Sequence, residues 1–273
     1  MNRIGRYIAP SYIAGEYLSD GLRVCRKYHQ LGWSSTIGLW DGETEPHSEI
    51  TQRHIDALEA IQAEELDSYL SIKAPSFGYR FKHLAEIIKT AKLKRTRIHF
   101  DSLYPQSVQP TLDLLHEAVK VYSNIGFTIP ARWGRSLDDV AHIIDTQCSM
   151  RVVKGQWEDP CNRGIDIEAC YVEIVRALAG KVPMVSIASH DPTLVEPCLD
   201  ILLESRTPCE LELLYGLPMG VSRIADRRGV PKRIYVPYGI AYLPYALADL
   251  KKRPRVLGWF IKDIFIRSFG LRE

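Results

Sequence analysis

The sequence predicts a single domain, residues 1–273, folded as an eight-stranded β/α barrel of the TIM type. The first observation is its length of 273 residues, because one such barrel takes about 250. The second is a series of eight short β-rich runs, separated by stretches with helical periodicity. The third is the lack of a G-x-G-x-x-G turn, which an open, doubly wound nucleotide-binding sheet normally carries. The barrel is therefore favoured over the open sheet.

The β-rich runs follow one another at regular intervals along the chain. Each has the length of one strand, and no linker or low-complexity segment interrupts the series. We expect strands at 34–40 (SSTIGLW), 68–74 (SYLSIKA), 97–102 (RIHFDS), 126–132 (GFTIPAR), 150–157 (MRVVKGQW), 183–189 (PMVSIAS), 209–215 (CELELLY) and 233–239 (RIYVPYG).

Two of the intervening helices carry recognisable start signals. Ser136 followed by Asp139 predicts a capping box, in which each side chain bonds the backbone of the other. Asp191 before Pro192 predicts an N-cap followed by proline at the first helical position. Both signals favour helices immediately after predicted strands.

Composition excludes several classes of protein. Hydrophobic residues make up 46% and charged residues 25%, as in ordinary globular domains. Lys and Arg number 35 against 33 Asp and Glu, so nothing points to a nucleic-acid partner. The six cysteines form no CxxC pair and the chain opens without a signal peptide, which favours reduced thiols in a cytoplasmic protein. No apolar run reaches the ~18 residues of a spanning helix.

Charged residues at the ends of two neighbouring predicted strands suggest a site. Lys73 and Asp101 both follow apolar runs, so both should lie in one partly buried mouth of the barrel. Because unpaired buried charges are costly, we expect them to form an ion pair or to bind a polar ligand. A purely structural ion pair is the alternative.

Strands five and six end in further candidates. Arg151 and Lys154 suit an anionic or electron-rich ligand, and Gly155 leaves room for a flat ring. His190 stands alone, and a lone histidine is more often a structural hydrogen-bonding group than a metal ligand. No second histidine lies at ligand spacing, so no metal is expected.

Seven segments, collinear along the chain, resemble the proline dehydrogenases. MRVVKGQWEDP is similar to their R-L-V-K-G-A-Y, SIASHDP to I-A-T-H-D, ELELLYGLPMG to E-F-Q-M-L-Y-G, and RIYVPYG to R-V-Y-V-P-Y-G. Upstream, SYIAGE, LSIKAPSFGY and IHFDS match the family's opening segments in order. Any one segment is weak evidence, but the collinear series covers nearly the whole chain.

The resemblance implies a barrel that binds FAD and oxidises proline to pyrroline carboxylate. It implies that a hydride passes to flavin N5 and that the electrons leave to a quinone, oxygen or another acceptor. By the same resemblance, Arg151 donates a hydrogen bond near N5, and Lys73, Asp101 and Tyr235 face the substrate as the other catalytic residues. The cofactor-binding residues would be Arg151, Lys154, Gly155, Gln156, Ala188, Ser189 and His190.

Two departures from the family bear on the substrate. In the family an Arg-Arg pair clamps the proline carboxylate; here Ala248 and Asp249 stand in that place, after Tyr245. Planar guanidinium forks suit carboxylates, so the clamp is lost and a repulsive charge is added. Lys252, one turn on, is a poor substitute because it is a point charge. We still place Tyr245, Ala248 and Asp249 at the substrate.

The second departure concerns the flavin. Pro130 replaces a glutamine that contacts the cofactor, and Arg132 follows it as an alternative anion binder in the mouth. Gln156 replaces an alanine near the isoalloxazine edge.

These observations favour a flavin-dependent oxidoreductase acting on a carbon–nitrogen or related nitrogen bond of a non-proline substrate. An amine, or a modified or carrier-attached amino acid in a biosynthetic reaction, meets the requirement. The alternatives are ordinary proline dehydrogenase, with Lys73, Arg132 or Lys252 holding the carboxylate, and a non-catalytic barrel that serves as a subunit.

The C-terminal stretch 256–270 (VLGWFIKDIFIRSFG) carries most of its apolar residues on one face. We expect a last helix packed on the barrel or on another copy. Peripheral contact with a membrane surface is the alternative.

Overall fold

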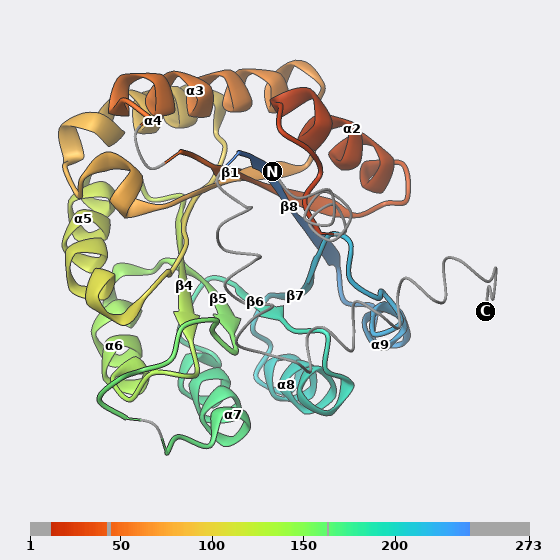
Figure 1. Ribbon diagram of the computed structural model, residues 1–273. Coiled ribbons are helices and arrows are strands. Elements are labelled where there is room, and N and C mark those ends of the chain that lie inside the picture. Colours follow the sequence, from red (N-terminus) through yellow and green to blue (C-terminus); the bar gives the residue numbers. More distant parts are fainter. Residues whose placement is uncertain (1–11, 43–44, 163, 241–273) are drawn as a thin grey trace, which may run out of the picture.

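Eight parallel strands close into one barrel in the computed structural model of the protein, which describes residues 12–42, 45–162 and 164–240. The strands follow one another in sequence order, and β8 pairs with β1 to complete the ring. Figure 1 shows the helices as an outer layer around the strands. The predicted β/α barrel is confirmed.

The strands are β1 (Ser34–Trp40), β2 (Ser68–Ile72), β3 (Ile98–Phe100), β4 (Ile125–Pro130), β5 (Ser149–Val153), β6 (Val185–Ala188), β7 (Cys209–Leu214) and β8 (Lys232–Gly239). The helices are α2 (Leu18–His29), α3 (His47–Ala63), α4 (Phe81–Lys94), α5 (Val108–Val121), α6 (Ser136–Ile143), α7 (Ile167–Leu178), α8 (Pro192–Glu204) and α9 (Ser222–Arg228). Short 3-10 turns occur at η2 (Ala74–Phe77), η3 (Pro105–Ser107) and η4 (Ile144–Thr146).

Every predicted strand is present, and several end earlier than expected. The run predicted at 150–157 stops at Val153, because Gly155 has a φ of 88° and turns the chain away from the sheet. Lys73 likewise lies just after β2, and Asp101 just after β3. Polar residues that were predicted inside strands therefore lie in the loops above them.

One of the two predicted helix starts is correct. The Asp191 side chain accepts from the Thr193 amide at 3.0 Å and caps α8, with Pro192 at its first position. The capping box at Ser136 is wrong, because Arg135 is the N-cap residue of α6. The Ser136 hydroxyl instead donates to the carbonyl of Pro130 at 2.5 Å, and so ties the helix back to β4.

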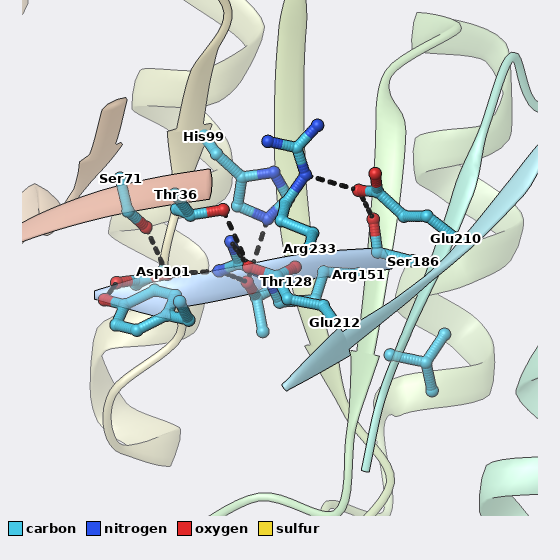
Figure 2. Close-up of polar contacts among 12 residues, drawn as sticks. Thr36, Ser71, His99, Asp101, Thr128, Arg151, Ser186, Glu210, Glu212 and Arg233 are labelled. Atoms are coloured by element: carbon cyan, nitrogen blue, oxygen red, sulfur yellow. Dashed lines mark hydrogen bonds and ion pairs between the residues drawn. The ribbon is translucent and has the colours of Figure 1, made fainter. Parts of the chain in front are cut away.

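Alternation along the strands separates two environments. In β7, Leu211 and Leu213 are fully buried in the hydrophobic core, whereas Glu210 and Glu212 make ion pairs within the barrel. The same period-two pattern recurs in β5, where Arg151 lies between the buried Met150 and Val152. The interior is therefore rich in paired charges (Figure 2).

Within the described residues, no helix combines the length and apolar character needed to cross a membrane.

Candidate active site

A cavity of about 910 Å³ opens at the C-terminal ends of the strands. Its volume is near the upper end of the roughly 300–1,000 Å³ typical of ligand and cofactor sites. The predicted site residues Tyr245, Ala248 and Asp249 lie outside the described residues, as do Lys252 and the C-terminal stretch. All the other predicted site residues line the cavity: Lys73, Asp101, Arg151, Lys154, Gly155, Gln156, Ala188, Ser189, His190 and Tyr235.

At the base of this cavity Glu212 binds the guanidinium of Arg151 with both carboxylate oxygens. Arg151 Nε donates to Oε2 at 2.7 Å and Nη2 donates to Oε1 at 2.9 Å. The two side chains are 4% and 2% exposed, so this is a buried bidentate pair. Burial opposes the charged guanidinium, but Glu212, Tyr69 and Asp101 outweigh it and raise the pKa of Arg151. Arg151 is therefore a fixed cation.

Asp101 is the second acid held against Arg151. Its Oδ1 accepts from Arg151 Nη1 at 2.7 Å and from Ser71 Oγ at 2.6 Å, and its Oδ2 accepts from the Tyr235 hydroxyl at 2.7 Å. Figure 2 shows Ser71, Asp101 and Arg151 converging on one point. One cation thus faces two carboxylates, Asp101 and Glu212, and the three-residue cluster carries a net charge of −1.

The structure corrects the expected ion pair between Lys73 and Asp101, because Asp101 pairs with Arg151. Lys73 Nζ donates to the carbonyl of Leu39 at 2.6 Å and lies 5.1 Å from the centre of the Trp40 ring. Burial lowers the pKa of Lys73, against the opposing influence of Asp101 and Asp41. A backbone carbonyl and an aromatic ring therefore hold the lysine, and its charge remains close to the cavity.

Tyr235 points from β8 toward the same cluster. A side chain at Gly38 would bring its Cβ within 2.5 Å of the Tyr235 hydroxyl oxygen, so glycine on β1 is what admits the ring. Burial raises the pKa of Tyr235 well above its ordinary value, and so does the charge of Asp101. The phenol is consequently a neutral donor, fixed with its ring 5.1 Å from the Arg151 guanidinium.

Lys154 and Gly155 lie on another wall, after β5. Lys154 Nζ donates to Asp191 at 2.7 Å and to Glu168 at 3.2 Å, and its side chain is 36% exposed. A Cβ at Gly155 would lie 2.9 Å from the Cβ of Pro130, so the backbone turn and this contact both require glycine. Arg132, expected as an alternative anion binder, donates its Nε to the carbonyl of Gly155 at 2.8 Å.

His190 has a structural task in the described part of the chain. The Leu214 amide donates to its Nε2 at 2.9 Å, so the proton is on Nδ1, which donates to the carbonyl of Pro218 at 2.9 Å. Burial lowers the pKa of His190, which keeps the ring neutral. Both ring nitrogens are used inside the protein, so the ring meets a ligand in the cavity through its carbon edge or face.

Sequence reasoning missed Glu212, which is the principal partner of Arg151. A signal was present, because Glu210-Leu211-Glu212-Leu213 alternates and places both acids on the same face of β7. In addition, Glu212 stands at the glutamine of the E-F-Q-M-L-Y-G segment that this stretch resembles. Tyr69 and Thr128 were also missed; their hydroxyl oxygens accept hydrogen bonds from Arg151 at 3.1 and 3.2 Å, respectively.

Among the described residues, no group of three or more His, Cys, Asp or Glu side chains could hold a metal ion.

No family model matches the sequence, but individual known proteins do. Proline dehydrogenase 1 of Bacillus subtilis subsp. natto is 23% identical over 274 residues, which cover 94% of this chain and 90% of that relative. The proline dehydrogenase of Deinococcus radiodurans is 22% identical over 278 residues, with 94% and 90% coverage. Over most of its length the chain resembles these proline dehydrogenases.

Solved structures of proline utilization A share the fold. The protein from Bdellovibrio bacteriovorus, inactivated by N-propargylglycine, superposes with a TM-score of 0.78 at 17% identity over 88% of this chain. The protein from Corynebacterium freiburgense superposes with a TM-score of 0.75 at 16% identity over 97% of this chain. The present chain spans only about a third of each of those longer chains, 32% and 33% respectively.

Proposed function

We propose that this protein is an FAD-dependent oxidoreductase that takes a hydride from a carbon bonded to an amine nitrogen, in a substrate without a free carboxylate. The resemblance to proline dehydrogenases over 94% of the chain supports the reaction class. One observation carries the choice of substrate: the cation at the base of the cavity, Arg151, is already held by two carboxylates.

The hydrogen bonds that Arg151 makes within the protein leave no pair of N–H groups to bind a substrate carboxylate. A guanidinium has five N–H groups. Nε bonds Glu212, Nη1 bonds Asp101 and Thr128, and Nη2 bonds Glu212 and Tyr69. A carboxylate that approached this cation would have to displace one of these acceptors.

The charge around the cavity base also favours a cationic ligand. Arg151 and Lys73 contribute two positive charges, whereas Asp41, Asp101 and Glu212 contribute three negative ones, for a net charge of −1. An ammonium group gains from that balance and a free carboxylate loses. The sequence adds a further acid, Asp249, at a position where the family carries arginine.

The cavity residues fit a flavin. Its volume suits a large cofactor, and aromatic side chains such as Trp133 and Trp157 line it beside Gly155 and Gln156. In our proposal Lys154 faces the phosphate portion, and Ala188, Ser189 and His190 line the wall beyond it. When bound, the flavin supplies the hydride acceptor, and the protein supplies position and electrostatics.

The substrate amine must lose a proton before its neighbouring carbon can release a hydride. We assign the proton acceptance to Asp101, whose carboxylate is held in place by Ser71, Arg151 and Tyr235. Tyr235 orients that carboxylate and packs beside the substrate. Lys73 contributes a positive charge to the cavity, and its ammonium group lacks the planar fork of a guanidinium.

Three ligands that share one ring test the substrate class. L-proline, L-prolinamide and pyrrolidine share the same ring carbon–nitrogen bond. The ring carbon beside the nitrogen carries a carboxylate, an amide and a hydrogen, respectively. We expect turnover with an artificial electron acceptor to give a higher kcat/KM for L-prolinamide and pyrrolidine than for L-proline. A higher kcat/KM for L-proline would reject the proposed substrate class.

A gain-of-function variant provides the matched control. Replacing Ala248 and Asp249 with arginine together should raise kcat/KM for L-proline and leave pyrrolidine little changed, because only L-proline has a carboxylate to bind. An amide- or thioester-linked amino acid on a carrier belongs to the same substrate class, and its turnover by the unaltered protein would fit a biosynthetic role.

Ordinary L-proline dehydrogenase is the second candidate function. The observation in its favour is that relatives covering more than nine-tenths of this chain are themselves named proline dehydrogenases. It requires Lys73, or residues outside the described part of the chain, to bind the carboxylate. Colourless protein that takes up no FAD would instead indicate the non-catalytic barrel.

A further inference from the structure

A second cavity lies at the opposite, N-terminal end of the barrel. It measures about 570 Å³ and lies where β2, β3, β4 and β8 begin. Its wall combines backbone from the loops before β2 and β3 with charged side chains. The charged residues that line it are Glu65, Asp67, Lys94, Arg95, Arg97 and Arg233, and the ring of Tyr69 lines it as well.

Arg97 lacks a counterion within the described residues. Its guanidinium lies 5.0 Å from the centre of the Tyr69 ring, and no described carboxylate oxygen lies within 4.0 Å of it. Its Nε reaches Asn124 Oδ1 only at 3.5 Å, and its Nη2 reaches the Met184 sulfur at 3.5 Å. The third nitrogen, Nη1, is buried and has no hydrogen-bond partner in the described part of the chain. A buried donor without an acceptor is costly, and more so on a charged group.

Arg233 presents a second guanidinium 4.3 Å from the centre of the same Tyr69 ring. Nε donates to Glu210 at 2.9 Å and Nη1 donates to the carbonyl of Ser35 at 2.5 Å, which fixes the side chain. Its Nη2 approaches Asp67 only at 4.0 Å. Figure 2 shows Arg233 with Glu210 and Ser186, in a group of contacts distinct from that of Arg151.

The charges that line this cavity do not balance. Lys94, Arg95, Arg97 and Arg233 give four positive charges, and Glu65 and Asp67 give two negative charges, for a net charge of +2. This is the reverse of the sign at the active-site end. Guanidinium groups with open N–H donors suit the paired oxygens of phosphate and carboxylate groups.

We propose that the N-terminal cavity is a binding site for a small oxyanion, such as a phosphate group, held by the Arg97 and Arg233 guanidiniums beside Tyr69. The ligand pairs with these two guanidiniums and neutralises the excess positive charge. The site is separate from the amine and flavin site, because the paired charges of the barrel interior lie between the two cavities. It does not depend on the proposed function.

Isothermal titration of the full-length protein with inorganic phosphate, at constant ionic strength, tests the site. We expect saturable binding that Arg97→Gln weakens by about tenfold or more, because it removes a charge-assisted contact. Lys94→Gln changes a half-buried residue at the rim of the cavity and should weaken phosphate binding less. This second variant still tests the site if Arg97→Gln fails to fold. Citrate in place of phosphate distinguishes a carboxylate ligand from a phosphate ligand.

Two controls locate the binding. Lys89→Gln changes an exposed lysine on α4 that does not line the cavity, and it should leave the affinity unchanged. Lys154→Gln removes a partly exposed cation of the other cavity and should also leave the affinity unchanged. Binding that Lys154→Gln abolishes, binding equal in Arg97→Gln and the unaltered protein, or no saturable binding of phosphate or citrate would each overturn the proposal.

Discussion

Glu212 of β7 accepts two hydrogen bonds from Arg151 of β5 inside the barrel, of 2.7 and 2.9 Å. The two strands are not neighbours, since β6 lies between them, so the pair links two strands across the one that separates them. Thr36 and Tyr69 add hydrogen bonds to the same carboxylate at 2.8 and 3.3 Å. Glu212 therefore both fixes the position of the guanidinium and cancels its charge.

Replacing Glu212 with glutamine should lower the free energy of unfolding by about 3 kcal/mol near neutral pH. The change removes one partner of a buried ion pair and turns an amide N–H toward groups that now donate. Denaturant unfolding measures the effect. Glu59→Gln, an exposed position on α3, is the matched control and should change stability little. A loss equal to that of the control would show that the pair contributes nothing.

Tyr235→Phe should cost about 2 kcal/mol of stability and lower turnover of the amine substrate. The change deletes the 2.7 Å hydrogen bond to Asp101 and leaves one carboxylate oxygen without its donor. Tyr215→Phe is the control, because the Tyr215 hydroxyl makes no hydrogen bond in the described part of the chain. If both variants keep full kcat/KM, Tyr235 has no part in orienting Asp101.

Stability should fall as the pH drops from 7 to 5, partly through His54. This side chain is buried, and burial lowers its pKa from 6.5 to about 4. The unfolded chain then binds a proton that the folded chain does not, so stability is lost as the pH falls through about 6.5 and continues to fall toward 4. At pH 5 this single group accounts for roughly 2 kcal/mol. His54→Gln should reduce the pH dependence by that amount, whereas the exposed His142→Gln should not. Identical pH profiles for the three proteins would contradict the assignment.

Gly155→Ala should destabilise the protein more than Gly180→Ala, by at least ~1 kcal/mol, and should weaken FAD binding. Both glycines have positive φ, 88° and 73°, so alanine is strained at either one. Only Gly155 has a neighbour in the way, because the new Cβ would lie 2.9 Å from Pro130, whereas nothing lies within 4 Å at Gly180. Equal losses of stability would mean that β4 yields to the added methyl group.

The fold could be predicted from the sequence because each strand is a separate local signal. β-branched runs, their spacing and the intervening helical periodicity all point to one closed parallel sheet. The N-cap at Asp191 was also predictable, since its partner is two residues away. The failure at Ser136 has a tertiary cause, because the carbonyl of Pro130 takes the hydroxyl that the local pattern assigned to the cap.

The partners within the site were harder to predict than its members. Residues at strand ends are brought together by any β/α barrel, so Lys73, Asp101, Arg151 and Tyr235 could be grouped without coordinates. Which acid meets which base depends on side-chain reach across the barrel. Asp101 therefore pairs with Arg151 rather than with Lys73, and Glu212 reaches Arg151 from inside β7.

The absorbance spectrum of the flavin-loaded protein under anaerobic conditions shows which ligands reduce the flavin. We predict that excess L-prolinamide or pyrrolidine bleaches the flavin band, and that the same concentration of L-proline leaves it nearly unchanged, because Arg151 is already bound by Asp101 and Glu212. Rapid bleaching by L-proline, with none by the two ligands that lack a carboxylate, would contradict the account and identify an ordinary proline dehydrogenase.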